Sequence, residues 1–392
     1  MNTEKIKRFF EGRKGLLPRI AAACSGEKDI IWFHVASYGE FCDARPVIEA
    51  TRKRFPERKI LLTVFSPAGY EPLKDYDQVD WVFYLPLDTP RNMQRLVDIV
   101  RPAKVIFNIG ENWFFLLRDL HRRKIDTYYF SVRIEPESSY LRWYGALHRW
   151  LFRHCYTSIM VQNKQSLEIF RQMGVTQVKL VGDARLEHVV ELSREPWSDA
   201  LVDAWCGGEK VFVAGNTYSI EHQMLVEVAN AHPKGKFMII PHANIAADVD
   251  EILALSQHGA VRYTDYKEAD ESLRKAQILV VNTVGMLTRL YRYGYAAYVG
   301  GGTTGAMPHS VVEPACYRMP VGFGPRYRRE PHCRDLAALR AGFPLDGTKE
   351  LALFYEKASE DAAFRELTGG VAQNYCQASE GATQRIMETI FG

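Results

Sequence analysis

The sequence predicts an α/β protein built from two doubly wound parallel sheets. Short apolar runs, rich in β-branched and aromatic residues, alternate with longer amphipathic and charged segments between residues 30 and 183. The alternation stops in a polar segment that contains Pro196, Gly207 and Gly208, and it starts again at Lys210. Because strands that alternate with helices pair in parallel, the two series indicate two Rossmann-like halves joined by a linker.

Each apolar run is a candidate buried strand. The first half is expected to contain strands at residues 30–37, 59–66, 79–86, 103–110, 127–134, 158–163 and 178–183. The second half is expected to contain strands at 210–216, 237–242, 260–264, 277–283, 296–301 and 320–324, followed by helices over 349–391. We therefore expect a first domain at 1–186, a linker at 187–208, a second domain at 209–375, and a final helix at 376–392 that packs back on the first domain.

The composition is that of a globular cytoplasmic protein. Hydrophobic residues make up 47% and charged residues 25% of the 392 positions, which is enough for two cores of ordinary size. The net charge of +3 does not call for a nucleic-acid partner, and we expect none. Seven scattered cysteines without a C-x-x-C pair argue against a zinc ribbon, a redox motif or a disulfide framework. The N-terminus has no apolar run of the length of a signal peptide or membrane span, so any membrane contact is expected to be peripheral.

A carboxylate stands where the first predicted strand turns into a helix. The apolar run from Ile31 ends in Ser37-Tyr38-Gly39-Glu40, and a helix is expected from 41 to 54. Ligands bind at the carboxyl ends of strands in open α/β sheets, so Glu40 is a candidate general base. The alternative is that Glu40 caps the helix, where its charge suits the helix dipole.

Three loops in the second half have the character of nucleotide-binding loops. Residues 300–305 match G-x-G-x-x-G, but Met307-Pro308 follows instead of a helix, so we expect contact with phosphate and no nicotinamide site. In H-S-V-V-E-P (309–314) the acid Glu313 could accept two ribose hydroxyls, or it could be a capping residue. In residues 215–221 backbone amides could hold a phosphate, although Glu221 is also a plausible first-turn acid of a helix.

Other patterns favour ordinary structural roles. The two D-x-D patterns, at 75–77 and 248–250, are interpreted as solvated faces, so no metal site is predicted. Ser37 lacks the first glycine of a G-x-S-x-G nucleophile elbow. The aromatic and basic run from Tyr140 to His154 is either an amphipathic helix with a buried stripe or a surface that meets anionic lipid, which Phe9-Phe10 could extend.

Together, these motifs resemble those of the Kdo transferases, which move 3-deoxy-D-manno-octulosonic acid (Kdo) from its CMP-activated form onto a lipid A precursor. The matching segments are E-G-R-K-G (11–15), H-V-A-S-Y-G-E (34–40), E-N-W (111–113), S-V-R-I (131–134), W-Y-G (143–145), V-Q-N (161–163), G-D-A-R (182–185), G-N-T (215–217), P-H (241–242), G-M-L-T-R-L-Y (285–291), G-G-G (300–302), H-S-V-V-E-P (309–314) and F-G-P (323–325). The resemblance implies a GT-B glycosyltransferase, with two Rossmann-like domains facing across a cleft. The first domain would bind the acceptor and the second the CMP-sugar donor.

The resemblance also assigns roles to individual residues. Glu40 matches the family's catalytic base and Glu111 its second essential acid, while Ile109 replaces the acid expected two residues before Glu111. Asn216 replaces a serine and Ser310 an asparagine of the family pattern. The residues expected to bind substrate or donor are Gly39, Arg133, Arg185, Gly215, Asn216, Thr217, Glu221, His242, Gly301, Gly302, His309, Ser310 and Glu313.

The implied reaction is an inverting transfer of Kdo from CMP-Kdo to a lipid A precursor, without metal or cofactor. It implies a place at the cytoplasmic face of the bacterial inner membrane, with peripheral contact to anionic lipid. The hydrophobic segment that usually precedes E-G-R-K-G in the family is absent from this sequence. Two alternatives stay open: a relative that uses another CMP-ulosonic acid or an NDP-sugar, and a non-catalytic lipid- or nucleotide-binding relative.

Overall fold

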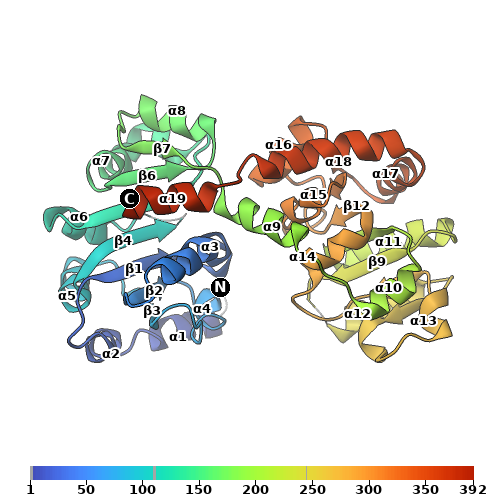
Figure 1. Cartoon of the computed structure of the whole chain (residues 1–392), viewed down its shortest axis with the longest axis horizontal. Coiled ribbons are helices and arrows are strands. Elements are labelled where there is room, and N and C mark those ends of the chain that lie inside the picture. The colour runs from blue at the N-terminus through green and yellow to red at the C-terminus, as the bar shows by residue number, and fades with distance from the viewer. Residues whose placement is uncertain (1–2, 109–111, 244) are drawn as a thin grey trace. The chain divides into compact units, whose positions relative to one another are not determined.

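The chain forms two compact units. The computed structural model describes residues 3–108, 112–243 and 245–392. Unit 1 consists of Met1–Glu187 with Ser379–Gly392, and unit 2 consists of His188–Ala378 (Figure 1). Among the described residues, each unit contains one seven-stranded sheet, and neighbouring strands are parallel throughout. The predicted doubly wound α/β class is confirmed.

The sheet of unit 1 has the order β3-β2-β1-β4-β5-β6-β7. Its strands are β1 (Ile30–Val35), β2 (Ile60–Val64), β3 (Trp81–Tyr84), β4 (Pro102–Asn108), β5 (Asp126–Val132), β6 (Ser158–Val161) and β7 (Val178–Leu180). The order reverses between β1 and β4, the point at which doubly wound folds bind ligands outside the carboxyl ends of strands.

Helices cover both faces of this sheet, which explains why its central strands are largely apolar. Trp32 lies in the core on one face, whereas Ile31 and Phe33 lie in the core on the other. The helices of unit 1 are α1 (Thr3–Glu11), α2 (Leu16–Ala23), α3 (Tyr38–Arg54), α4 (Pro67–Tyr70), α5 (Pro90–Val100), α6 (Phe114–Arg122), α7 (Ala146–His154) and α8 (Lys164–Gln172), with short 3₁₀ turns η1 (Ser139–Leu141) and η2 (Trp143–Gly145).

The end of the chain returns to unit 1. Helix α19 (Ala382–Phe391) packs on α3, and Ile386 and Ile390 lie buried in the core beneath it. The ring of Phe391 lies 4.9 Å from that of Phe55. The preceding residues form α18 (Ala362–Gln377), which packs on α15 (Val312–Cys316) in unit 2.

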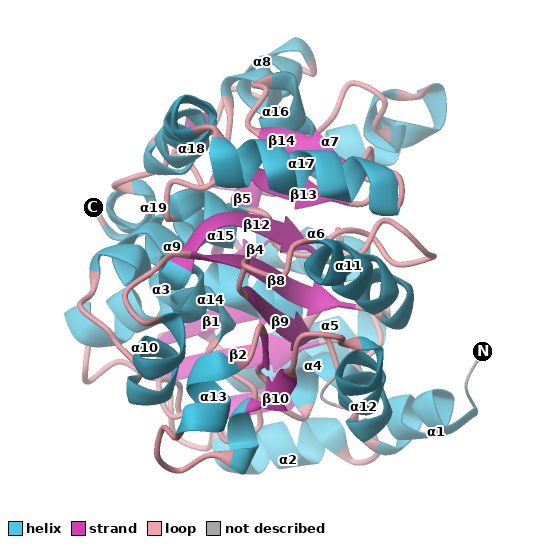
Figure 2. Ribbon diagram, turned by 90° about the vertical axis from the view of Figure 1, so that its right-hand side faces the viewer, coloured by secondary structure: helices cyan, strands magenta, loops and turns pink. Residues whose placement is uncertain are grey.

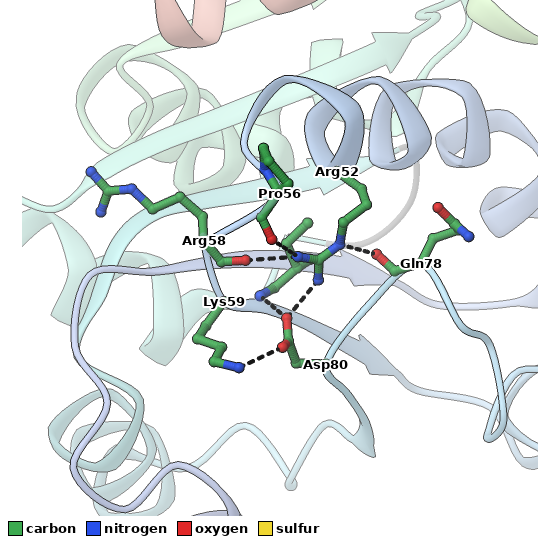
Figure 3. Close-up of polar contacts among 7 residues, drawn as sticks. Arg52, Pro56, Arg58, Lys59, Gln78 and Asp80 are labelled. Carbon is green, nitrogen blue, oxygen red and sulfur yellow. Dashed lines mark hydrogen bonds and ion pairs between the residues drawn. The ribbon is translucent and has the colours of Figure 1, made fainter.

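A network of charges anchors the far end of α3. Arg52 donates to Asp80 at 2.6 Å, Lys59 donates to the second carboxylate oxygen at 2.9 Å, and the Ile60 amide also donates to Asp80 (Figure 3). Burial acts to raise the pKa of Asp80, but these hydrogen bonds outweigh it and leave the pKa below its ordinary value. The network ties the C-terminal turn of α3 to β2, which fixes the direction of the helix that begins near Glu40.

Unit 2 also forms a parallel sheet, but its strand order, β10-β11-β9-β8-β12-β13-β14, differs from that of unit 1 because β11 lies between β10 and β9. Its strands are β8 (Val211–Thr217), β9 (Phe237–Pro241), β10 (Ala260–Arg262), β11 (Ile278–Val280), β12 (Gly294–Val299), β13 (Val321–Phe323) and β14 (Gly342–Pro344). Figure 2 shows β8, β9 and β12 side by side and pointing the same way. The sequence analysis missed β14, because three residues with glycine and proline carry no strand pattern.

The remaining helices belong to unit 2 or join the units. They are α9 (Ala184–Arg194), α10 (Ala200–Cys206), α11 (Ser219–Ala231), α12 (Ala246–Leu255), α13 (Glu271–Lys275), α14 (Leu287–Leu290), α15, α16 (Pro331–Ala338), α17 (Thr348–Glu360) and α18. The segment expected to be a linker, 187–208, therefore includes helical residues, and Trp205 of α10 is buried in the core of unit 2. No helix in the described part of the chain is long and apolar enough to cross a membrane.

Candidate active site

Glu40 is held at the carboxyl end of β1. Its carboxylate accepts a 2.6 Å hydrogen bond from the backbone amide of Ala36, and its own amide lies 3.4 Å from the capping hydroxyl of Ser37. Its carbonyl accepts a hydrogen bond from the side chain of Asn108, at the end of β4. Gly39 is exposed, and a Cβ built there would meet only Ser37 Oγ, at 3.9 Å. Glu40 is thus oriented at the edge of the sheet where ligands bind in this fold.

A second acid, which the sequence analysis did not select, lies one helical turn beyond Glu40. Asp43 is 9% exposed and faces Arg185, with 3.6 Å between its Oδ1 and the guanidinium. Burial raises the pKa of Asp43; Arg185 opposes the rise, and Asp183 and Glu40 add to it. The only available signal was the i, i+3 spacing from Glu40, which places both acids on one helix face. Arg185, expected to bind substrate, is engaged within unit 1.

Arg133 lies directly after β5, on the same edge of the sheet. Its Nε donates to Glu135 at 3.0 Å, and its side chain is 13% exposed. Because β1, β4 and β5 are neighbours, Glu40, Asn108 and Arg133 lie at or after three adjacent strand ends. Glu111, the expected second acid, lies outside the described residues.

In unit 2, Glu221 braces two loops. It is 1% exposed and accepts hydrogen bonds from the amides of Tyr218 (2.9 Å) and Gly301 (2.8 Å) and from the hydroxyl of Tyr298 (3.2 Å). Burial raises the pKa of Glu221, although these hydrogen bonds oppose the rise. The carboxylate links the start of α11 to the glycine-rich loop. Glu221 therefore has a structural role, because it holds these two segments together.

The glycine-rich loop also uses its own amides for its structure. Gly300 donates to the Gly215 carbonyl at 2.9 Å, and Gly302 donates to the Ala306 carbonyl at 2.7 Å. A Cβ on Gly301 would lie 2.2 Å from the Met307 carbonyl, and the φ of Gly301 is +95°. The backbone amides of Gly300, Gly301 and Gly302, which were expected to face a phosphate, therefore already donate hydrogen bonds within the protein. The backbone amides of residues 303–305 donate no hydrogen bond to a backbone carbonyl of the described residues.

The end of β8 is similarly constrained. A Cβ on Gly215 would lie 2.2 Å from the Tyr291 hydroxyl, so only glycine fits there. Asn216 has a positive φ of 55°, which asparagine tolerates better than most residues. Thr217 is fully buried. These residues set the path of the loop.

Three aromatic side chains gather where β8, β9 and β12 end. The hydroxyl of Tyr218 lies 2.8 Å from Nε2 of His309, and the rings of His242 and His309 are 4.4 Å apart. Burial lowers the pKa of His309 to about 4, and His242 adds to the effect. His309 is therefore neutral near pH 7. The sequence analysis selected both histidines but missed Tyr218, which only the sheet order brings to them.

Two further polar residues follow His309 closely in the sequence. The buried hydroxyl of Ser310 has no hydrogen-bond partner among the described residues. Glu313 accepts a hydrogen bond of 2.9 Å from Thr288. Ser310 directly follows His309 in the chain, and its hydroxyl, which lacks a hydrogen-bond partner, suits a polar ligand.

A basic pocket lies beside the glycine-rich loop. A cavity of about 420 Å³ is lined by residues 304–307 and by Pro325, Arg326, Arg328 and Arg329. Arg326 donates to the Thr304 carbonyl at 3.2 Å. The guanidinium groups of Arg328 and Arg329 make no hydrogen bond or ion pair with the described residues. The sequence analysis missed these arginines, although the R-Y-R-R run directly follows F-G-P.

Two Rossmann-like units, each with a parallel sheet whose order reverses beside its first strand, define the fold class. Among solved structures, MurG of Acinetobacter baumannii superposes with a TM-score of 0.57 at 13% identity, over 93% of this chain and 99% of that one. The fold is that of GT-B glycosyltransferases, as predicted.

The sequence comparisons narrow the class. Residues 8–188 match the family model described as 3-deoxy-D-manno-octulosonic-acid transferase (kdotransferase). The chain is 23% identical over 372 residues to the 3-deoxy-D-manno-octulosonic acid transferase of Haemophilus influenzae, covering 92% of this chain and 86% of that protein. It is 26% identical over 359 residues to the Aquifex aeolicus enzyme of the same name, covering 90% and 89%. The protein is a glycosyltransferase, related to the Kdo transferases along most of its length.

Proposed function

We propose that this protein transfers Kdo from CMP-Kdo to a lipid A precursor, with inversion at the anomeric carbon and without a metal in the transfer step. The observation that carries the proposal is the placement of Glu40. Its carboxylate is oriented by the Ala36 amide at the end of β1, at the position of the family's base. A fixed carboxylate at a ligand-binding edge is what general-base catalysis requires.

Unit 1 is proposed to activate the acceptor. Glu40 takes the proton of an acceptor hydroxyl, and the oxygen forms a bond to the anomeric carbon of Kdo. The bond from that carbon to the phosphate oxygen breaks, and its electron pair leaves with CMP. Arg133 and Glu111 would orient the acceptor.

Unit 2 is proposed to bind the donor. CMP-Kdo carries a phosphate and a carboxylate, and unpaired guanidinium groups bind both with charge-assisted hydrogen bonds. Arg328 and Arg329 supply such groups in the pocket beside the glycine-rich loop. The rings of Tyr218, His242 and His309 offer flat surfaces against which a base or sugar ring can pack.

An exposed aromatic surface supports the proposed peripheral contact with anionic lipid at the cytoplasmic face of the inner membrane. Trp143 is 86% exposed, and Tyr144, Leu147 and Trp150 beside it are also exposed, in η2 and α7. Aromatic rings of this kind favour the lipid interface. Phe9 is not a free extension of this surface, because its ring packs on Phe65 and under Arg13.

A product assay by mass spectrometry tests the proposal. The protein is incubated with a lipid A precursor and either CMP-Kdo, a different CMP-ulosonic acid, or UDP- and GDP-sugars. We expect the precursor to gain Kdo from CMP-Kdo alone. Preference for another donor would contradict the assignment of Kdo, and binding without any turnover would favour a non-catalytic relative.

A further inference from the structure

A buried histidine in unit 2 points one ring nitrogen at two carboxylates. His222, on the first turns of α11, is 0% exposed. Its Nε2 lies 3.0 Å from the Thr217 hydroxyl. Its Nδ1 has no hydrogen-bond partner among the described residues, and the nearest carboxylate oxygen, of Glu251, is 3.5 Å away.

One tautomer of this histidine presents a lone pair to the carboxylates. When the Thr217 hydroxyl donates to the Ile240 carbonyl, 3.4 Å away, it accepts a hydrogen from Nε2 of His222. Nδ1 of the neutral ring then carries a lone pair. A lone pair that faces carboxylates in a buried place is unfavourable unless a cation lies between them.

The two carboxylates come from one face of the neighbouring helix. Asp248 and Glu251 are three residues apart on α12, which packs on α11. Glu251 also accepts hydrogen bonds from Ser219 (2.8 Å) and Gln223 (2.9 Å), which fix its orientation. Asp248 is half-buried, and its side chain makes no hydrogen bond or ion pair with the described residues. Asp250, the other acid of the D-x-D pattern, instead pairs with Arg262.

We propose that His222, Asp248 and Glu251 bind a divalent transition-metal ion of the Zn²⁺ type. The three ligand atoms lie within 4.8 Å of one another. Bonds of about 2.0–2.2 Å to a tetrahedral ion place ligand atoms about 3.4 Å apart, close to the 3.5 Å between His222 and Glu251. One imidazole and two carboxylates suit Zn²⁺, Mn²⁺ or Fe²⁺ better than Ca²⁺ or Mg²⁺, which prefer oxygen alone. No metal site was predicted from the sequence, in which His222 and Asp248 are far apart.

The ion links two helices to the loop after β8. His222 contacts Thr217 through its other nitrogen, so binding at Nδ1 also fixes the residue at the strand end. The ion is a structural element in this proposal and takes no part in transfer. The inference does not depend on the proposed reaction.

The test is metal binding to the full-length protein after treatment with EDTA. Zn²⁺ is titrated by calorimetry, and Co²⁺ is followed by visible absorption, which reports its ligands. We expect one ion per chain, without the intense thiolate absorption that binding to cysteine would give. Asp248→Asn, Glu251→Gln and His222→Gln should each weaken binding at least ~10–100-fold, whereas the adjacent control Asp250→Asn should bind like the parent.

Several outcomes overturn the proposal: no binding at one ion per chain, a thiolate spectrum, or unchanged affinity in Asp248→Asn. If His222→Gln does not fold, the affinity of Asp248→Asn for the metal decides between the outcomes. Asp248 is half-exposed, so its substitution should not prevent folding. A second readout is the unfolding temperature, which should rise with Zn²⁺ in the parent and in Asp250→Asn but not in Asp248→Asn.

Discussion

Units 1 and 2 share the doubly wound parallel α/β class but carry different chemistry at the carboxyl ends of their strands. In both, the first strand of the unit pairs with the next strand on one side and with a later strand on the other, so the order reverses beside it. Unit 1 places Glu40, Asp43 and Arg185 near that point, whereas unit 2 places aromatic rings, imidazoles and unpaired arginines there. The shared backbone provides the location, and the loops provide the chemistry. This contrast suggests that proton transfer belongs to unit 1 and donor binding to unit 2.

The largest expected effect separates the two units directly. Glu40→Gln keeps the shape of the side chain but removes its basicity, so kcat should fall by about 10²–10⁴-fold. The Kd for CMP should not change, because the nucleotide is assigned to unit 2. Steady-state kinetics and calorimetry measure both quantities, with exposed Glu57→Gln as the control. Full activity in Glu40→Gln would contradict the assignment of Glu40 as the general base.

A change in the basic pocket of unit 2 should leave the rate of transfer unchanged and weaken binding of the donor. Replacing Arg328 and Arg329 together by alanine removes two charge-assisted contacts, and the Kd for CMP-Kdo should rise ~10–100-fold. At saturating donor, kcat should stay near that of the parent. Arg274→Ala, an exposed arginine elsewhere in unit 2, is the control. An unchanged Kd would exclude the basic pocket as the donor site.

The glycine-rich loop tests whether shape or free amides matter in unit 2. Gly301→Ala should lower the free energy of unfolding by about 1–3 kcal/mol, because its φ is +95° and its Cβ would clash with the Met307 carbonyl. Gly305→Ala is the matched control, since a Cβ there meets nothing within 4 Å. Denaturant unfolding compares them. Equal stability of the two variants would contradict the structural role given to Gly301.

The anchor of α3 sharpens the account of unit 1. Asp80→Asn should cost about 1–2 kcal/mol at pH 7, because Arg52 and Lys59 lose their shared partner. The pKa of Asp80 is lowered in the folded state, so its contribution is present above the unfolded value of 3.8 and is lost as the pH falls through the folded value. The difference between parent and variant should therefore shrink below about pH 4. Asp77→Asn, an exposed neighbour, should show no such difference.

The smallest effect concerns the exposed aromatic surface, which is gathered in unit 1. Trp143→Ser with Trp150→Ser should weaken binding to vesicles containing anionic lipid by ~10-fold or less. Leu367→Ser removes an exposed apolar residue of α18 in unit 2 and should have no effect. Vesicle co-sedimentation measures both. Equal loss in the two variants would contradict a surface specific to unit 1.

Much of this molecule was readable from local pattern. Strands buried on both faces are continuous apolar runs, so thirteen of the fourteen strands observed among the described residues were expected from the sequence. Glu40 was recognisable because a strand, a turn and a helix start are all local features. Whether Glu40 is a base or a cap was not decided by sequence, and the structure shows its carboxylate accepting a hydrogen bond from the backbone amide of Ala36.

Groups that meet across long stretches of chain were decided only by the tertiary structure. Tyr218, His242 and His309 come together because β9, β8 and β12 are neighbours in the sheet, an order that no local pattern encodes. The amides of the glycine-rich loop looked available until their partners, Gly215 and Glu221, were placed beside them. His222 and Asp248 are far apart in the sequence, and only the packing of α11 on α12 brings their side chains together. The sequence by itself determined the periodicity, and with it the two sheets; packing between distant segments determined which side chains share a site, because side-chain contacts depend on strand order and helix pairing.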